Sequence, residues 1–162
     1  MGDGPRYLAP TLEFVIAGRP LCGGCNGVIK GRGEKGVRLG GSVDAYKALI
    51  RLSVKQAMLM QGWSLTKEPI YISLIVCVGI GSERHPDIIR KMYKGEIIPN
   101  REPRLTRLMN VIVKTLKGIV YAQEAQIAGE FIIKRYAKEE RVEVLIGAPR
   151  NYKELTHDIR NS

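Results

Sequence analysis

The chain has few acidic residues for the number of basic ones. Its 162 residues include 16 Asp and Glu against 26 Lys and Arg, which gives a formal net charge of +10. An excess of this size indicates an anionic partner, of which nucleic acid is the most common. The alternative is a basic surface that serves only solubility, and it is weaker because solubility requires a smaller net charge.

Long apolar runs are missing as well. Residues 1–10 lack the apolar segment of a signal peptide. The most apolar stretch, Ile70 to Ile80, is far shorter than the about 20 residues that cross a bilayer. We therefore expect a cytoplasmic protein with reduced thiols and no membrane partner.

Cysteine is scarce. Cys22 and Cys25 form a Cys-x-x-Cys pair, which is compatible with half of a zinc site or with a redox pair. A zinc site needs four ligands, and the only other candidates are Cys77, His85 and His157. Cys77 lies in an apolar strand pattern, and no thioredoxin-like βαβ pattern surrounds the pair. Chance spacing is the favoured interpretation, and the sequence leaves open whether the pair binds metal.

Apolar patterns of period two and period 3.6 predict an α+β fold. The expected strands are Leu12–Ile16, Ile70–Val78, Gln126–Tyr136 and Val142–Ile146, and the expected helices run from Ser42, the N-cap, to about Gln61 and from about Leu105 to Lys117. Residues 79–103 have no clear periodicity and are predicted to form a long loop. We expect one domain over 1–162, with a core at about 11–148 and a polar tail at 149–162.

A glycine-rich segment, residues 20–41, is predicted to be a flexible loop that closes over a phosphate backbone. Its basic residues are Lys30, Arg32, Lys35 and Arg38. Three of its glycines match Gly-x-Gly-x-x-Gly, but the required strand before and helix after are not evident, so the match is interpreted as accidental. A plain flexible hairpin is the alternative. A second basic set, Lys47, Arg51 and Lys55 in the first helix, is interpreted as a solvated face.

The segment 103–127 carries the most specific pattern in the chain. It opens with Pro-Arg-Leu-Thr-Arg-Leu and closes with Gln-Glu-Ala-Gln-Ile. It resembles the signature of RusA-type Holliday-junction resolvases, which runs Pro-Asp-x-Asp-Asn-Leu-x-Lys-x-x-x-Asp-x-Leu-x-Gly, then a short spacer, then Asp-Asp-x-Gln-Ile. The framework positions that agree are Pro103, Leu108, Leu116, Gly118, Tyr121, Gln126 and Ile127.

The resemblance implies several properties. The fold would be a mixed β-sheet of about four strands packed with two main helices. The partner would be DNA, including branched DNA, and the active form would be a homodimer. Family members hydrolyse a phosphodiester with Mg²⁺, which their carboxylates position.

The chain departs from the family where the family keeps its acids. The aspartates of Asp-x-Asp correspond to Arg104 and Thr106, the asparagine to Arg107, the lysine to Asn110, the helix aspartate to Lys114, and the downstream pair to Gln123 and Glu124. Only Glu124 keeps a carboxylate, and Arg104 and Lys114 would put positive charge beside the vacated cation site. We therefore expect no metal site, no cofactor and DNA binding in place of catalysis.

The substituted residues suggest a direct role in binding. Arg107, Asn110 and Lys114 fall at i, i+3 and i+7 on one helix face, with Arg104 in the first turn. We predict that this face contacts DNA phosphates; the alternative is drift after loss of activity.

Two other functions remain open from the sequence. In the first, the chain is an active junction-resolving nuclease with relocated acids, in which Asp87, Glu96 and Glu102 approach Glu124. In the second, it is a protein-interaction or assembly module whose basic surface meets an acidic protein.

Overall fold

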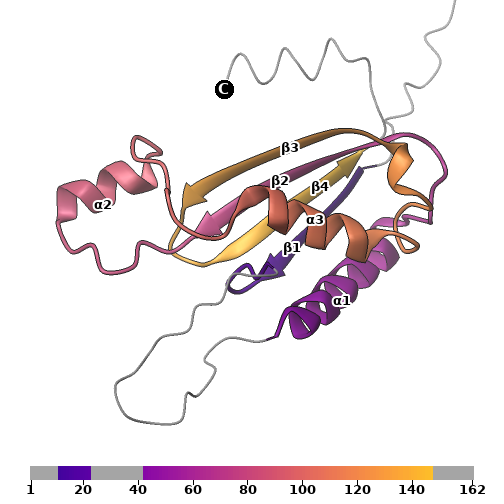
Figure 1. Ribbon diagram of the computed structural model, residues 1–162, viewed down its shortest axis with the longest axis horizontal. Coiled ribbons are helices and arrows are strands. Elements are labelled where there is room, and N and C mark those ends of the chain that lie inside the picture. Colours follow the sequence, from indigo (N-terminus) through magenta and orange to yellow (C-terminus); the bar gives the residue numbers. More distant parts are fainter. Residues whose placement is uncertain (1–10, 23–41, 148–162) are drawn as a thin grey trace, which may run out of the picture.

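The computed structural model describes residues 11–22 and 42–147, and within them a four-stranded mixed sheet (Figure 1). The strands are β1 (Thr11–Ala17), β2 (Ile70–Val78), β3 (Ile127–Tyr136) and β4 (Arg141–Gly147). They lie in the order β1-β4-β2-β3, with β2 parallel to β3 and the other two pairs antiparallel. The predicted α+β class and the mixed four-stranded sheet are confirmed. The predicted phosphate contacts Lys30, Arg32, Lys35 and Arg38, and the tail 149–162, lie outside the described residues.

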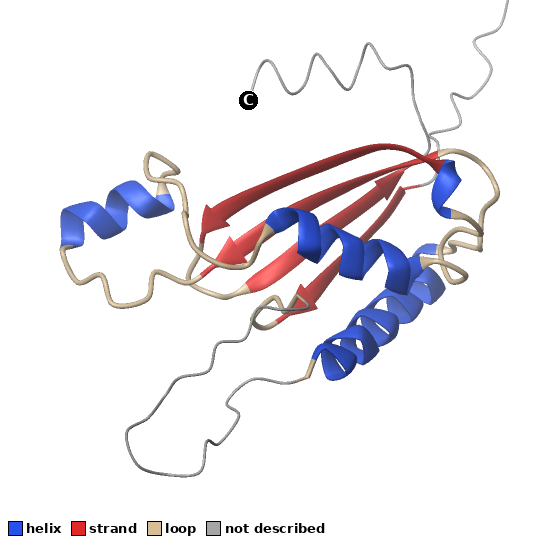
Figure 2. Cartoon of the chain, viewed as in Figure 1, coloured by secondary structure: helices blue, strands red, loops and turns tan. Residues whose placement is uncertain are grey.

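In the described part of the chain, three α-helices accompany the sheet: α1 (Val43–Gln61), α2 (Pro86–Tyr93) and α3 (Leu105–Leu116). The predicted ends of α1 are confirmed. The Ser42 hydroxyl accepts a hydrogen bond from the Ala45 N–H at 3.1 Å, and Gly62 ends the helix at a φ of 69°, in the left-handed region that favours glycine. Figure 2 shows α1 and α3 lying across the same side of the sheet.

The expectation of a loop throughout residues 79–103 is wrong, because α2 forms within it. Pro86 occupies its first turn, where a missing N–H has no cost. The helix is only eight residues long and none of them is buried. The helix is therefore too short, and packs too little against the core, for its apolar periodicity to be recognised among the neighbouring glycines and prolines.

One hydrophobic core fills the space between the sheet and the helices α1 and α3. Leu12, Ile72 and Leu74 from the strands and Ile50 and Leu108 from the helices are almost completely buried. Each such side chain contributes about 1.5–3 kcal/mol relative to an exposed one. Because the strands point alternate residues to opposite faces, the other face of the sheet does not join this core.

The cysteines differ in state. Cys77 is a free thiol, buried as predicted. Cys22 is buried too, but it is disulfide-bonded, so the expectation of reduced thiols is wrong at this position. Cys25 lies outside the described residues. Within 11–22 and 42–147, no helix combines the length and the apolar character that a bilayer span requires.

Tyr46 on α1 gives a first testable expectation. Its hydroxyl is buried without a hydrogen-bond partner among the described residues, and burial raises the pKa of Tyr46. A buried unpaired hydroxyl carries a desolvation penalty. We expect Tyr46→Phe to raise the free energy of unfolding by about 1 kcal/mol and the Tm by about 2–4 °C. Thermal and urea unfolding measure both, and a destabilised variant would show that the hydroxyl has a partner.

Candidate nucleic-acid interface

Helix α3 separates a buried face from a basic one. Leu108, Met109, Ile112 and Leu116 are buried against the core, as the sequence predicts. Arg107, Asn110 and Lys114 are exposed on the opposite face. No Asp or Glu occurs between Leu105 and Leu116. The exposed face of α3 therefore carries cations and an amide, with no carboxylate from the same helix.

The cations of α3 are spread along the helix axis. Arg104 precedes the first turn and Lys114 lies in the last. With a rise of 1.5 Å per residue, ten residues separate their backbones by about 15 Å. Arg104 and Lys114 therefore lie at opposite ends of the helix. Their positive charges suit an extended anionic ligand better than a single small ion.

Arg104 is the N-cap of α3 and is paired locally. Its backbone N–H donates to Oε2 of Glu102 at 2.9 Å, and its Nε lies 3.7 Å from Oε1 of the same carboxylate. The two side chains are 65% and 51% exposed, so water screens the pair and its contribution is at most about 1 kcal/mol. An anionic ligand would have to compete with Glu102 for this arginine.

A hollow of about 330 Å³ opens at the same end of α3. It is lined by Arg19, Pro20, Val78, Gly79, Gly81, Arg101, Glu102, Pro103 and Glu140. Two arginines and two glutamates balance its charge, so it is less suited to an anion than the exposed face of α3.

Arg101 organises this hollow, and sequence reasoning did not identify it because it lies in the segment that was expected to be a loop. Its guanidinium donates to the Gly79 carbonyl and lies 5.8 Å from the centroid of the Tyr136 ring. A side chain at Gly81 would collide with that guanidinium. Lys134 donates to the Arg101 carbonyl, and burial lowers the pKa of Lys134 while Glu102 opposes that shift. These contacts hold the chain that leads into α3.

Glu124 lies at the opposite end of the sheet, in the 3₁₀ turn Glu124–Gln126 that leads into β3. Gln126 fixes this turn. Its Oε1 accepts from the N–H groups of Ala122 and Gln123 at 2.9 and 2.7 Å, and its Nε2 donates to the carbonyls of Thr66 and Glu68, both at 3.0 Å. The amide thus uses all four of its hydrogen-bonding positions, a structural reason for glutamine here.

Glu130 is a second carboxylate near this turn that the sequence analysis did not single out. Burial raises the pKa of Tyr121, and the charges of Glu124 and Glu130 add to that effect. Glu130 pairs in register with the buried Ile72 and therefore points to the helix side of the sheet. The alternation of side chains along the predicted strand could have placed Glu130 on this side of the sheet.

The structure does not bring the proposed relocated acids together. Asp87 pairs with Arg90 on α2 at 2.9 Å, Glu102 lies beside Arg104, and Glu124 is at the far end of the sheet. Across the described residues, which include Glu96, no three His, Cys, Asp or Glu side chains gather closely enough to hold a metal ion.

No protein-family model matches this chain, and neither does any curated protein.

Proposed function

We propose that this protein binds the phosphate backbone of DNA, including branched DNA, through the exposed face of α3, and that it is a RusA-like protein that no longer cuts its ligand. The observation that carries the proposal is the charge of this face. Arg107 and Lys114 stand on it with the amide of Asn110 between them, and the helix contains no acid. Together with Arg104 at the N-cap, these cations span about 15 Å, which suits a chain of phosphates better than a single small anion.

The proposed loss of DNA cleavage follows from the acidic residues that this chain lacks. Mg²⁺ requires six oxygen ligands in near-octahedral geometry and is usually held by one or two carboxylates together with substrate phosphates. Of the positions that align with the family's acids, only Glu124 has a carboxylate, and it lies about the length of α3 away from Arg104. Glu124 is the one candidate catalytic residue, and it has no second aligned acid beside it.

Two copies of the chain would present two such faces. The homodimer implied by the resemblance would let one protein hold two arms of a branched DNA, and each arm would add to the affinity of the other. The alternative partner, an acidic protein, would use the same cations without requiring a regular spacing of charge.

Binding to labelled four-way junctions and duplexes, measured by fluorescence anisotropy over about 50–300 mM NaCl, tests the proposal. Each phosphate contact contributes a slope of about −0.9 to log K against log salt, so contacts from Arg104, Arg107 and Lys114 predict a slope of about −2.7 or steeper. The protein is first treated with nuclease and purified at high salt. Absence of binding at 50 mM NaCl would contradict DNA binding, and retention of an acidic protein after nuclease treatment would favour the alternative.

A further inference from the structure

Helix α1 carries large apolar side chains outside the face that it buries. Leu52 is 65% exposed, Met60 is 80% exposed and Leu59 is 87% exposed. The core contacts of α1 are made by other residues, so the packing of the described chain does not account for these three. Isolated apolar residues are common on protein surfaces, but three within about two turns of one helix indicate a surface that a partner covers.

A hollow of about 470 Å³ lies between the last two turns of α1 and the turn that follows α3. We call it the α1 hollow, and it is lined by Lys55, Met58, Leu59, Trp63, Gly118 and Ile119. Four of these side chains are large and apolar, and Lys55 is the one charged residue of the lining. The α1 hollow therefore suits an apolar side chain that enters beside a negative charge.

Hydrogen bonds within the chain hold the walls of the α1 hollow. The Trp63 backbone N–H donates to the Met58 carbonyl at 3.0 Å, and the indole Nε1 of Trp63 donates to the Val120 carbonyl at 3.3 Å. On the other side, the Gly118 N–H donates to the Tyr121 carbonyl at 2.7 Å. Because these walls are already in place, a ligand can enter with little cost of rearrangement.

Three cations lead away from the α1 hollow along the helix. Lys47, Arg51 and Lys55 recur at every fourth residue, about 6 Å apart along the axis and on one side of α1. Arg51 and Lys55 are exposed and Lys47 is half-buried. None of the three forms an ion pair within the described residues. The only acid on α1 is Asp44, in its first turn.

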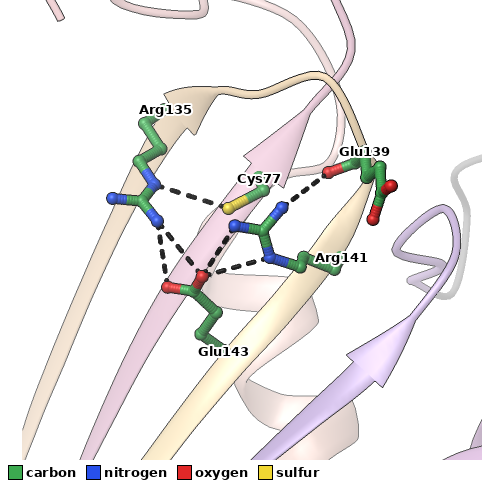
Figure 3. Close-up of polar contacts among 5 residues, drawn as sticks. All are labelled: Cys77, Arg135, Glu139, Arg141 and Glu143. Carbon is green, nitrogen blue, oxygen red and sulfur yellow. Dashed lines mark hydrogen bonds and ion pairs between the residues drawn. The ribbon is translucent and has the colours of Figure 1, made fainter. Parts of the chain in front are cut away.

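The arginines on the helix-free side of the sheet show the contrast (Figure 3). Arg135 donates from Nη2 to both oxygens of Glu143 at 3.1 Å, and Arg141 donates from Nη2 to the same carboxylate at 2.9 Å. Those two cations are neutralised by their own chain. The described residues supply no such carboxylate to Lys47, Arg51 and Lys55, so their counter-charge comes from solvent ions or from a partner.

From these observations we infer that α1 and the α1 hollow bind an acidic amphipathic helix of another protein. An apolar side chain of that helix fills the α1 hollow, and carboxylates spaced three or four residues apart meet Lys55 and Arg51 on the following turns. Leu52 lies two turns before Leu59 on the same side of α1 and extends the apolar contact.

The exposed apolar residues favour a protein over a nucleic acid at this surface. Phosphates would meet Arg51 and Lys55 but would leave Leu59 and the apolar walls of the α1 hollow without a matching contact. The site includes none of the residues on the exposed face of α3. The inference therefore goes beyond DNA binding, and it can be tested without DNA.

The expected affinity is modest. Exposed ion pairs each contribute little and are screened by salt, so the burial of one or two apolar side chains supplies most of the binding. We expect a Kd of about 10–100 µM at 50 mM NaCl, rising about tenfold at 500 mM NaCl.

Fluorescence anisotropy with synthetic helices tests the inference. The probes are fluorescein-labelled, Ala-based helices of about 18 residues with Leu recurring at i, i+3 and i+7 and with Glu on one side, on the other side or on both sides of the Leu stripe. Matched probes carry Lys in place of each Glu. Nuclease-treated protein is titrated to about 500 µM, and at least one Glu probe should saturate while the Lys probes should not bind.

Variants locate the contact. Leu59→Asp, and separately Arg51→Glu with Lys55→Glu, should each weaken binding of the Glu probe at least about tenfold. Lys91→Glu with Lys94→Glu is the matched charge control, because both double variants lower the net charge by four, from +10 to +6, and these lysines are exposed at α2, which Figure 1 shows well apart from α1. The control should change the Kd less than about threefold.

A second control matches Leu59→Asp. Ile98 is 72% exposed and lies between α2 and α3, so Ile98→Asp introduces the same charge at an exposed apolar position outside the α1 hollow. It should bind the Glu probe like the wild type. Circular dichroism should show every variant folded, because each substituted side chain is exposed.

Three outcomes would overturn the inference. One is that no Glu probe binds up to about 500 µM, or that Lys probes bind equally well, which would make the cations of α1 a solvated face. Another is an equal loss in the α1 and α2 double variants, which would reduce the binding to net charge. The third is a DNA duplex that displaces the probe and itself loses as much affinity in the α1 variant, which would assign these cations to nucleic acid.

Discussion

Replacing Tyr121 with alanine should remove about 3–5 kcal/mol from the free energy of unfolding, the largest loss we expect from any single side chain. Tyr121 has no exposed surface and is among the largest fully buried side chains. Its hydroxyl donates to the Val113 carbonyl of α3, and its own carbonyl accepts from the Gly118 N–H at 2.7 Å. Removing the ring leaves a cavity and breaks the link between α3 and the chain that follows it.

Two further variants separate the causes. Tyr121→Phe keeps the ring and loses only the hydroxyl, so we expect a loss of about 1–2 kcal/mol. Tyr93→Ala is the matched control, because Tyr93 on α2 is 41% exposed and belongs to a helix with no buried residue. It should change stability by less than about 1 kcal/mol. Urea unfolding measures all three, and a loss below 1 kcal/mol for Tyr121→Ala would mean that this position is not a core anchor.

The elements with strong local signals could be predicted from the sequence. The strand Ile70–Val78 was expected at the bounds that β2 has, because a near-continuous apolar run rich in Ile and Val identifies an interior strand. Helix α1 was expected from Ser42 to Gln61, because its cap residues and its buried face agree. Helix α2 was missed because no residue in it is buried, and burial is what makes an apolar pattern regular.

The candidate site was predicted only in part. Helical spacing correctly placed Arg107, Asn110 and Lys114 on one exposed face. The motif alignment could not reveal that Arg104 and Glu124 lie at opposite ends of the sheet. Residues that stand close together in a sequence motif can lie far apart in space. Here the length of α3 separates the residues at the two ends of the motif. Arg101 was missed for a related reason, since its partner Gly79 is 22 residues away.

Reversing two charges on α3 should abolish DNA binding. We expect Arg107→Glu with Lys114→Glu to weaken affinity for a four-way junction at least about 100-fold at 50 mM NaCl, since two phosphate contacts are lost and two repulsive ones replace them. The slope of log K against log salt should become shallower by about 1.8, because each lost phosphate contact removes about 0.9. Both side chains are exposed, so the fold should tolerate the change.

A control on α1 decides whether this effect belongs to α3 or to the overall charge. Arg51→Glu with Lys55→Glu also changes two exposed cations on a helix, and both double variants lower the net charge by four, from +10 to +6. We expect the α1 variant to lose less than about fivefold, because it alters only the general field of the molecule. Equal losses in the two variants would mean that DNA responds to net charge and not to the exposed face of α3. A greater loss of affinity in the α1 variant would indicate that DNA contacts the basic residues of α1. The two variants have the same net charge and differ only in which helix carries the substitutions.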